Sequence, residues 1–148
     1  MGKRERGNEM SNSTAVSAVA KTASYITEYN AITAVMNTYN EAVQTGRSEV
    51  MRASFHPAAT FFGYYQGQLL AGPCQVLFDW VDGNGPAPDV KILQVSVEIH
   101  NTIATVRLEM EDLKGKLCVP EGGTLSDLFQ LIKIDGQWKI SQKSFHWH

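Results

Sequence analysis

The stretch Leu128–Ile140, LFQLIKIDGQWKI, decides the fold class of this chain. Two runs rich in apolar and β-branched residues flank Asp135-Gly136, and an Asp-Gly pair in that position is a strong signal for a two-residue hairpin turn. The sequence therefore predicts two long antiparallel strands, over residues 125–134 and 137–148.

More strands precede this hairpin. Residues 90–101, VKILQVSVEIHN, alternate between apolar and polar side chains, which is the period of a half-buried strand. Residues 102–115, TIATVRLEMEDLKG, repeat the pattern with one phase slip, which we interpret as a β-bulge. A shorter, aromatic hairpin is predicted over residues 59–65 and 67–71, with its reversal at Gly67.

Three helices are predicted before and between these strands. The first ends at Gly46 and carries apolar residues at three- and four-residue spacing, which are Tyr25, Tyr29, Ile32, Met36, Tyr39 and Val43. A short helix from Ser48 stops before Pro57, and a third lies between Pro73 and Gly83. This order predicts an α+β fold, in which three helices pack on one face of a strongly curved antiparallel sheet. We expect one domain over residues 25–148 after a flexible tail over residues 1–24.

Composition excludes several classes of partner. The 148 residues carry a net charge of −2, which gives no electrostatic reason to expect nucleic acid or an anionic membrane. No apolar run is long enough to span a bilayer. The spacing of Cys74 and Cys118 indicates neither a disulfide framework nor a zinc site, so we expect a cytoplasmic protein.

Residues 39–63, YNEAVQTGRSEVMRASFHPAATFFG, and residues 135–148, DGQWKISQKSFHWH, carry a family resemblance. In this order and spacing they resemble the nuclear transport factor 2-like superfamily, especially its SnoaL-like and lumazine-binding-like branches. The resemblance covers about residues 25–148. It implies a cone-shaped barrel whose hollow binds a small, cyclic, largely apolar molecule.

The same resemblance implies a set of ligand-binding residues. Tyr39, Trp80, Gln130 and Phe145 are expected in the pocket, and His56, Phe62 and Tyr64 near its mouth. The rings would bury the apolar body of the ligand. Tyr39 and Gln130 would orient a polar group, and Gln130 is the partner expected for the buried Tyr39 hydroxyl.

Catalytic competence stays open at this point. In the ketosteroid isomerase branch a helix tyrosine, an aspartate base and a protonated aspartic acid act together, and this chain offers Tyr39, Gly63 and Gln130 at those positions. Because Gly63 has no side chain, that mechanism is disfavoured. An isomerase, dehydratase or cyclase with His56 or an unplaced carboxylate as base is the alternative, and a third reading is an association module with a residual pocket.

No cofactor or metal is expected. The sequence shows no phosphate-cradling glycine loop, and His146 and His148 lack a convincing third metal ligand. The strand charges, Asp127 among them, are interpreted as a solvated or dimer-facing surface.

A homodimer through the sheet is also predicted. The reason is that the last two strands carry apolar residues on faces that one cone cannot bury entirely by itself; these are Phe129, Leu131, Trp138 and Ile140.

Overall fold

The computed structural model describes residues 25–115 and 122–148, so the predicted tail over residues 1–24 and Cys118 lie outside the described residues. The helices are α2 (Tyr25–Thr45), α3 (Ser48–Arg52) and α4 (Gln75–Asn84). The strands are β1 (Phe55–Tyr65), β2 (Gln68–Pro73), β3 (Lys91–His100), β4 (Ile103–Leu113), β5 (Gly123–Ile134) and β6 (Gln137–Trp147). The predicted α+β architecture is confirmed, although Pro73 ends β2 instead of starting the third helix.

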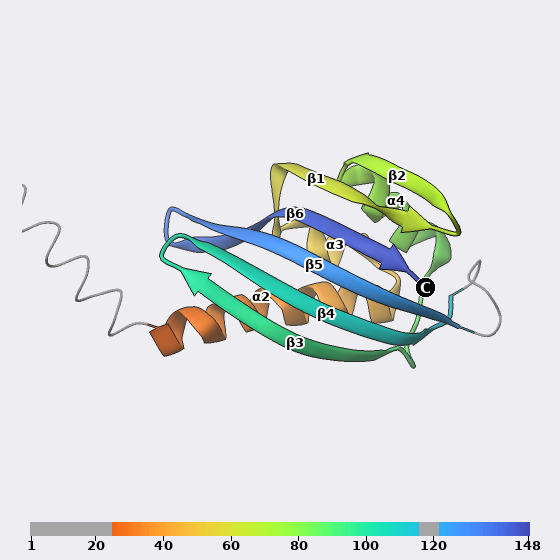
Figure 1. Cartoon of the computed structure of the whole chain (residues 1–148), viewed down its shortest axis with the longest axis horizontal. Helices are drawn as coiled ribbons and strands as arrows, with labels where there is room; N and C mark the ends of the chain where they lie inside the picture. Colours follow the sequence, from red (N-terminus) through yellow and green to blue (C-terminus); the bar gives the residue numbers. More distant parts are fainter. Residues whose placement is uncertain (1–24, 116–121) are drawn as a thin grey trace, which may run out of the picture.

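The strands form one curved sheet in the order β2-β1-β6-β5-β4-β3, and the helices pack on one side of it (Figure 1). Neighbouring strands are antiparallel except β1 and β6, which run parallel, so the sheet is mixed. This parallel pairing arises because β6, which follows β5 in a hairpin, lies between β5 and β1 and runs in the same direction as β1, instead of pairing with β3 at the other edge of the sheet. The sheet is not closed into a barrel, since β2 and β3 are its two edges.

Two predicted turns are confirmed by their backbone geometry. Asp135 and Gly136 both adopt positive φ, 49° and 78°, as a two-residue hairpin turn that follows the twist of its strands requires. Gly46 has a φ of 68° directly after α2, in the left-handed conformation that ends many helices.

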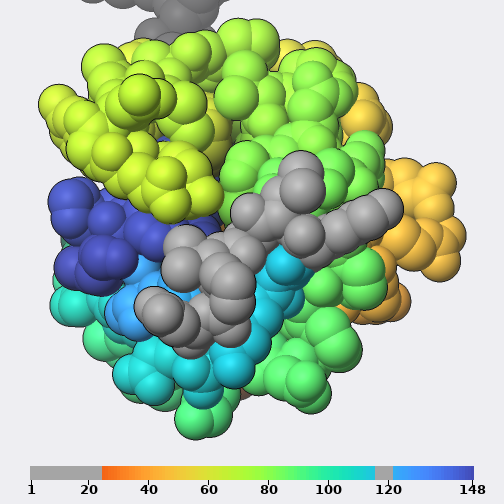
Figure 2. Space-filling model, turned by 90° about the vertical axis from the view of Figure 1, so that its right-hand side faces the viewer, coloured from red at the N-terminus to blue at the C-terminus, as the bar shows by residue number. Residues whose placement is uncertain are grey.

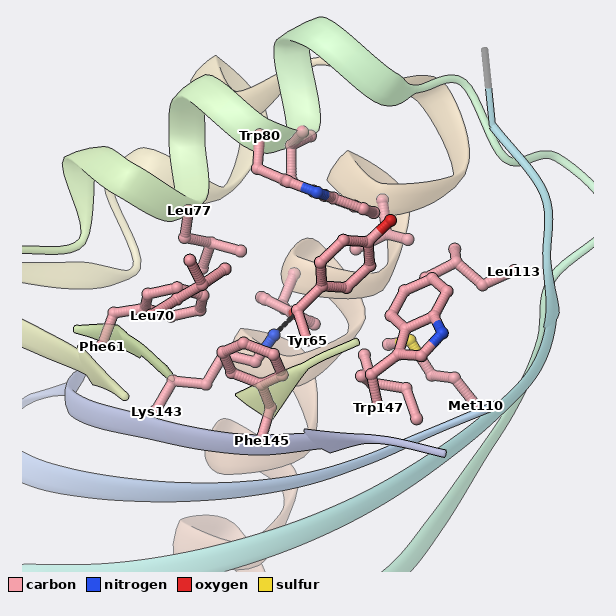
Figure 3. A pocket seen from close by; sticks show the side chains of 14 residues that line it. Phe61, Tyr65, Leu70, Leu77, Trp80, Met110, Leu113, Lys143, Phe145 and Trp147 are labelled. Carbon is pink, nitrogen blue, oxygen red and sulfur yellow. Dashed lines mark hydrogen bonds between the residues drawn. The ribbon is translucent and has the colours of Figure 1, made fainter. Parts of the chain in front are cut away.

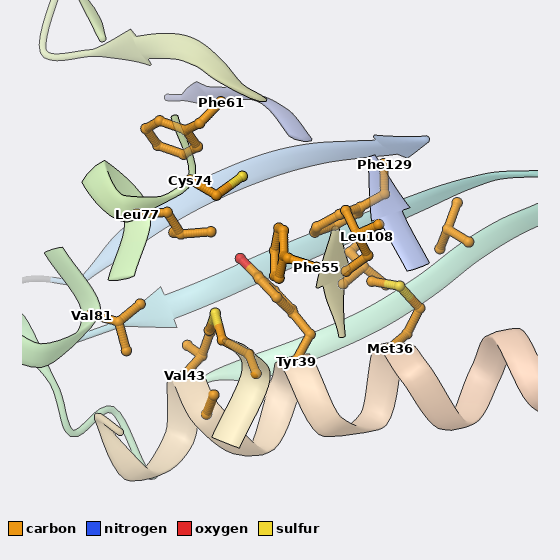
Figure 4. Packing of buried hydrophobic residues seen from close by; sticks show 14 of the residues in the cluster. Met36, Tyr39, Val43, Phe55, Phe61, Cys74, Leu77, Val81, Leu108 and Phe129 are labelled. Carbon is orange, nitrogen blue, oxygen red and sulfur yellow. The ribbon is translucent and has the colours of Figure 1, made fainter. Parts of the chain in front are cut away.

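The hydrophobic core lies between α2 and the inner face of the sheet (Figure 4). Met36 and Tyr39 from α2 are at most 1% exposed. The four residues that were expected to need a partner are buried as well, since α2 and the other helices cover them; they are Phe129, Leu131, Trp138 and Ile140. One chain therefore buries these side chains alone, and they give no reason to expect a dimer.

One irregularity in β6 decides which of its side chains face inward. Gln130 pairs with Gln142, but the next residue, Leu131, pairs with Ile140, so Ser141 is an extra residue in β6. Its hydroxyl donates a hydrogen bond to the Gln130 carbonyl at 3.1 Å. Because side chains alternate along a strand, this bulge shifts the inward-facing set by one position. After Ile140, the side chain that turns inward is Lys143.

Among the described residues, no helix is long and apolar enough to cross a membrane.

Candidate functional site: an apolar pocket with a buried lysine

An apolar pocket lies between α4, the end of α2 and the inner face of the sheet (Figure 3). Its deep end is formed by Tyr39 and Lys143, and three half-buried rings, Tyr65, Trp80 and Trp147, surround its outer end. The empty volume, counted out to the mouth and including space open to solvent, is about 460 Å³. Figure 2 looks onto this end of the molecule, where the surface dips between the β1–β2 hairpin and α4.

Six of the fourteen residues that line the pocket are aromatic. Phe61 and Phe145 stack with centroids 4.8 Å apart, and Trp147 meets Tyr65 edge to face at 5.0 Å. The Phe145 ring fills the space above Gly63, where an added Cβ would lie 2.1 Å from the Phe145 Cδ1 atom. The base position that the isomerase comparison assigns to Gly63 is therefore closed as well as empty.

The one charged side chain among the residues that line the pocket is Lys143, and it is only 3% exposed. Its Nζ atom donates a hydrogen bond to the Tyr39 hydroxyl at 2.7 Å and lies 3.3 Å from Oδ1 of Asp127. Four aromatic rings surround this nitrogen with centroids at 5.2–5.8 Å; they are Tyr39, Phe61, Phe129 and Phe145. A buried cation in such a wall is costly to maintain unless it is paired, and Asp127 is the pair.

Asp127 is completely buried behind Lys143. Neither of its carboxylate oxygens has a hydrogen-bond partner among the described residues. Within that part of the chain, the positive charge of Lys143 is therefore the one nearby group that offsets the cost of burying this carboxylate. Burial raises the pKa of Asp127, and the neighbouring Lys143 charge offsets part of that rise. The carboxylate is therefore a better proton acceptor than an exposed aspartate.

Tyr39 remains a phenol at neutral pH. Burial raises its pKa well above the usual value, and the negative charge of Asp127 adds to the rise. Its oxygen accepts from Lys143, which leaves the hydroxyl proton free to point into the pocket. The deep end thus presents two donors, N–H and O–H, to a ligand that can accept.

The structure brings three of the seven predicted ligand-binding residues to this pocket: Tyr39, Trp80 and Phe145. On β1 the aromatic alternation is as expected but in the opposite phase, since Phe61 and Tyr65 face the pocket. Phe62 and Tyr64 lie on the outer face and are 43% and 50% exposed.

Two further predicted residues also lie away from this pocket. Gln130 is exposed, because it alternates with the buried Phe129 and Leu131, and Lys143 takes the place expected for it beside Tyr39. His56 sits at the start of β1, where its Nδ1 accepts a hydrogen bond from the Ala58 backbone at 3.0 Å.

Sequence reasoning missed Lys143 and misread Asp127 as a surface charge. A signal for both was present. In the alternation along β5, Asp127 falls on the same buried face as Leu125 and Phe129. Trp138 and Phe145 are both apolar but out of phase, which indicates a bulge between them and an inward Lys143.

Other reactive groups are less suited to chemistry here. Burial raises the pKa of the Cys74 thiol to about 11, so it is not a thiolate at neutral pH. The His146 and His148 rings meet edge to face with centroids 4.9 Å apart, and Nε2 of His148 shares a hydrogen bond with the Ser126 hydroxyl at 2.9 Å. Within residues 25–115 and 122–148, no three His, Cys, Asp or Glu residues are placed to hold a metal ion.

The chain is similar to proteins that share this architecture. Residues 27–146 match the family described as "Putative lumazine-binding". The protein named aldolase FrzH from Cladobotryum sp. is 32% identical over 119 residues, which cover 80% of this chain and 90% of that protein.

Solved structures agree. An NTF2-like protein of unknown function from Methylobacillus flagellatus is 38% identical, with a TM-score of 0.75 over 83% of this chain and 94% of that one. Another, from Shewanella baltica, is 33% identical, with a TM-score of 0.73 over 84% and 96%. The chain therefore belongs to the "Putative lumazine-binding" family and has the nuclear transport factor 2-like fold.

Proposed function

We propose that this protein binds a small, cyclic, largely apolar molecule that carries a carbonyl group. The observation that carries the proposal is the position of Lys143, a buried amine at the deep end of a pocket whose other walls are almost entirely apolar. The rings would take the apolar body of the ligand, and the carbonyl oxygen would accept from Lys143 Nζ and the Tyr39 hydroxyl.

The polarity of the deep end supports a carbonyl over other groups. The two groups available to a ligand there are both donors, and the carboxylate of Asp127 does not line the pocket. A ligand N–H would find no free acceptor and would lose its hydrogen bonds to water, at about 1–3 kcal/mol. An acceptor oxygen avoids that cost.

The proposal can be tested by calorimetry with a matched pair of bicyclic molecules, 2-tetralone and its hydrocarbon analogue tetralin. We expect the protein to bind the ketone about tenfold more tightly, since a hydrogen bond to a charged donor contributes about 1.5–3 kcal/mol. Lys143→Met should reduce this preference, because the Tyr39 hydroxyl is then the one deep donor left for the ketone, and it should leave the affinity for tetralin nearly unchanged.

Gln130→Ala is the matched control, because Gln130 lies on the outer face of the sheet. It should bind both molecules as the unmodified protein does. A ketone preference that Lys143→Met leaves unchanged, or an unmodified protein that binds neither molecule, would contradict the proposal.

A second candidate is catalysis of a ring closure at a carbonyl compound, and the relative named aldolase favours it. Two donors fixed at one point in a dry pocket are placed to stabilise an oxygen that becomes negative during carbon–carbon bond formation. A base at the isomerase position is absent, because Gly63 has no side chain and the Phe145 ring fills the space above it. Among isomerase, dehydratase and cyclase activities, these features support the cyclase.

The homodimer remains a prediction, now with different support. The outer face of the sheet exposes Phe62, Tyr64 and Leu128, at 43%, 50% and 58%. Burial of such side chains in a partner would contribute favourably. Light scattering at micromolar concentration should give a mass near twice 16.4 kDa, and a mass near 16.4 kDa would contradict the dimer.

A further inference from the structure

We infer that Lys143 is a covalent catalytic residue, whose Nζ condenses with the carbonyl carbon of a cyclic ketone or aldehyde to form an iminium ion. The inference rests on the proposed function and goes beyond it, because it replaces a hydrogen bond to the carbonyl by a bond to its carbon. It concerns residues that no comparison with a known protein assigns.

The surroundings of the amine fit an iminium ion. Four ring centroids lie 5.2–5.8 Å from Nζ, and the faces of aromatic rings attract a cation. The side chain is only 3% exposed, so bulk water has little access to the new C=N bond. A covalent intermediate of this kind needs that protection, since water reverses its formation.

The amine also has the two partners that the reaction needs. A lysine must lose a proton before it can attack, and Oδ1 of Asp127, 3.3 Å away and without a hydrogen bond of its own, is placed to accept it. The Tyr39 hydroxyl lies 2.7 Å from Nζ on the pocket side and can donate to the carbonyl oxygen. Burial raises the pKa of Asp127, which strengthens it as an acceptor.

The steps balance without any further reactant. The ammonium gives a proton to Asp127, and the freed nitrogen lone pair attacks the carbonyl carbon while the C=O pair moves to oxygen. That oxygen takes a proton from the attacking nitrogen, through Tyr39, to form a neutral carbinolamine. Asp127 then returns its proton to the nitrogen, and Tyr39 relays a proton from the nitrogen to the hydroxyl. The C–O bond breaks as the nitrogen lone pair forms the C=N bond, and water leaves. In sum, a ketone and Lys143–NH₃⁺ give an iminium ion and one water.

The test uses the full chain with 2-tetralone and sodium cyanoborohydride, which reduces an iminium ion to a stable secondary amine. Peptide mapping by mass spectrometry then locates the adduct. Lys139 lies on the same strand but is only half-buried, and its Nζ donates a hydrogen bond to the Ala53 carbonyl at 2.6 Å, so it reports the rate of a lysine outside the pocket in the same sample. We expect Lys143 to be modified at least about tenfold faster than Lys139, despite its burial.

Two variants sharpen the result. Lys143→Arg keeps a cation but cannot form an iminium ion, and it should abolish the fast adduct. Asp127→Asn should slow the adduct by about tenfold or more, because the proton acceptor is gone. The mapping of the unmodified protein decides the question even if either variant fails to fold.

The possible failures can be told apart. If 2-tetralone binds by calorimetry but adducts form only on exposed lysines, the covalent role is overturned and the binding proposal stands. If the ketone neither binds nor forms an adduct at Lys143, both are overturned.

Discussion

Two cation–carboxylate pairs lie on the two faces of the same sheet, and they differ in contact distance and in burial. On the outer face, Arg107 holds Glu109 with two short hydrogen bonds from Nε and Nη2, at 2.9 and 2.6 Å, and the two side chains are 50% and 25% exposed. On the inner face, Lys143 and Asp127 lie 3.3 Å apart and are 3% and 0% exposed. Contact distance alone would rank the outer pair as the more important.

Burial reverses that ranking. If the outer pair is broken, water replaces the lost partner, so exposed ion pairs contribute little to stability. If the inner pair is broken, water cannot solvate the charge that remains, because both positions are buried. The pKa values of the two carboxyls already differ in direction: hydrogen bonds from Arg107 hold that of Glu109 below its usual value, while burial raises that of Asp127.

The largest expected effect comes from the same amide substitution in each pair. Asp127→Asn should lower the free energy of unfolding by about 3–5 kcal/mol, because it leaves the Lys143 charge buried without a partner. Glu109→Gln should change it by about 1 kcal/mol or less. Urea unfolding of both variants at pH 7 measures the difference, and equal losses would mean that burial does not distinguish the two pairs.

Removing both inner charges should restore much of this loss. The double variant Lys143→Met/Asp127→Leu replaces the pair by apolar side chains, and we expect its free energy of unfolding to lie within about 2 kcal/mol of the unmodified protein. Urea unfolding, with the two single variants beside it, gives the coupling energy. Strictly additive losses would show that the two side chains do not act as a pair.

The rigidity of the pocket wall can be tested with two glycines. Gly63→Ala should cost about 1–3 kcal/mol, because its Cβ would overlap the Phe145 ring and force that ring toward the cavity. Gly83→Ala is the control, since nothing lies within 4 Å of an added Cβ there and the residue is helical. It should be neutral or stabilise by up to about 1 kcal/mol. Thermal unfolding compares them, and equal effects would mean that the wall yields freely.

The smallest expected effect is a difference in acid sensitivity. Glu109 has a lowered pKa when folded, so its contribution is complete above 4.5, the unperturbed value, and is lost as pH falls through the folded value. Glu109→Gln should therefore flatten the loss of stability in acid.

Urea midpoints from about pH 7 to about pH 3 provide this measurement. The variant is compared with the unmodified protein across the series, so that the constant cost of the substitution cancels. Parallel pH profiles for Glu109→Gln and the unmodified protein would contradict the lowered pKa assigned to Glu109.

Most of the fold could be predicted from the periodicity of apolar residues, but several of the side chains that line the pocket could not. The hairpin turn at Asp135-Gly136 and the end of α2 at Gly46 follow from local backbone preferences, which a short window of sequence contains. The inward position of Lys143 depends on the bulge in β6: the phases of Trp138 and Phe145 indicate a bulge between them, but only the pairing with β5 places it at Ser141. The phase error on β1, where Phe61 was passed over for Phe62, has the same origin, because both residues are aromatic and alternation alone does not say which face is inner.

The extra residue in β6 has a consequence for how homologous sequences are compared. The strand carries two alternative sets of side chains after Ile140, one with Lys143 and Phe145, the other with Gln142 and Ser144, and the bulge at Ser141 selects between them. A homologue with one residue fewer at that point still directs its lysine into the pocket. A homologue with the same number of residues but a regular strand directs it into solvent. Descent of the site should therefore be traced by strand register, with gaps near residue 141 counted before any lysine is matched.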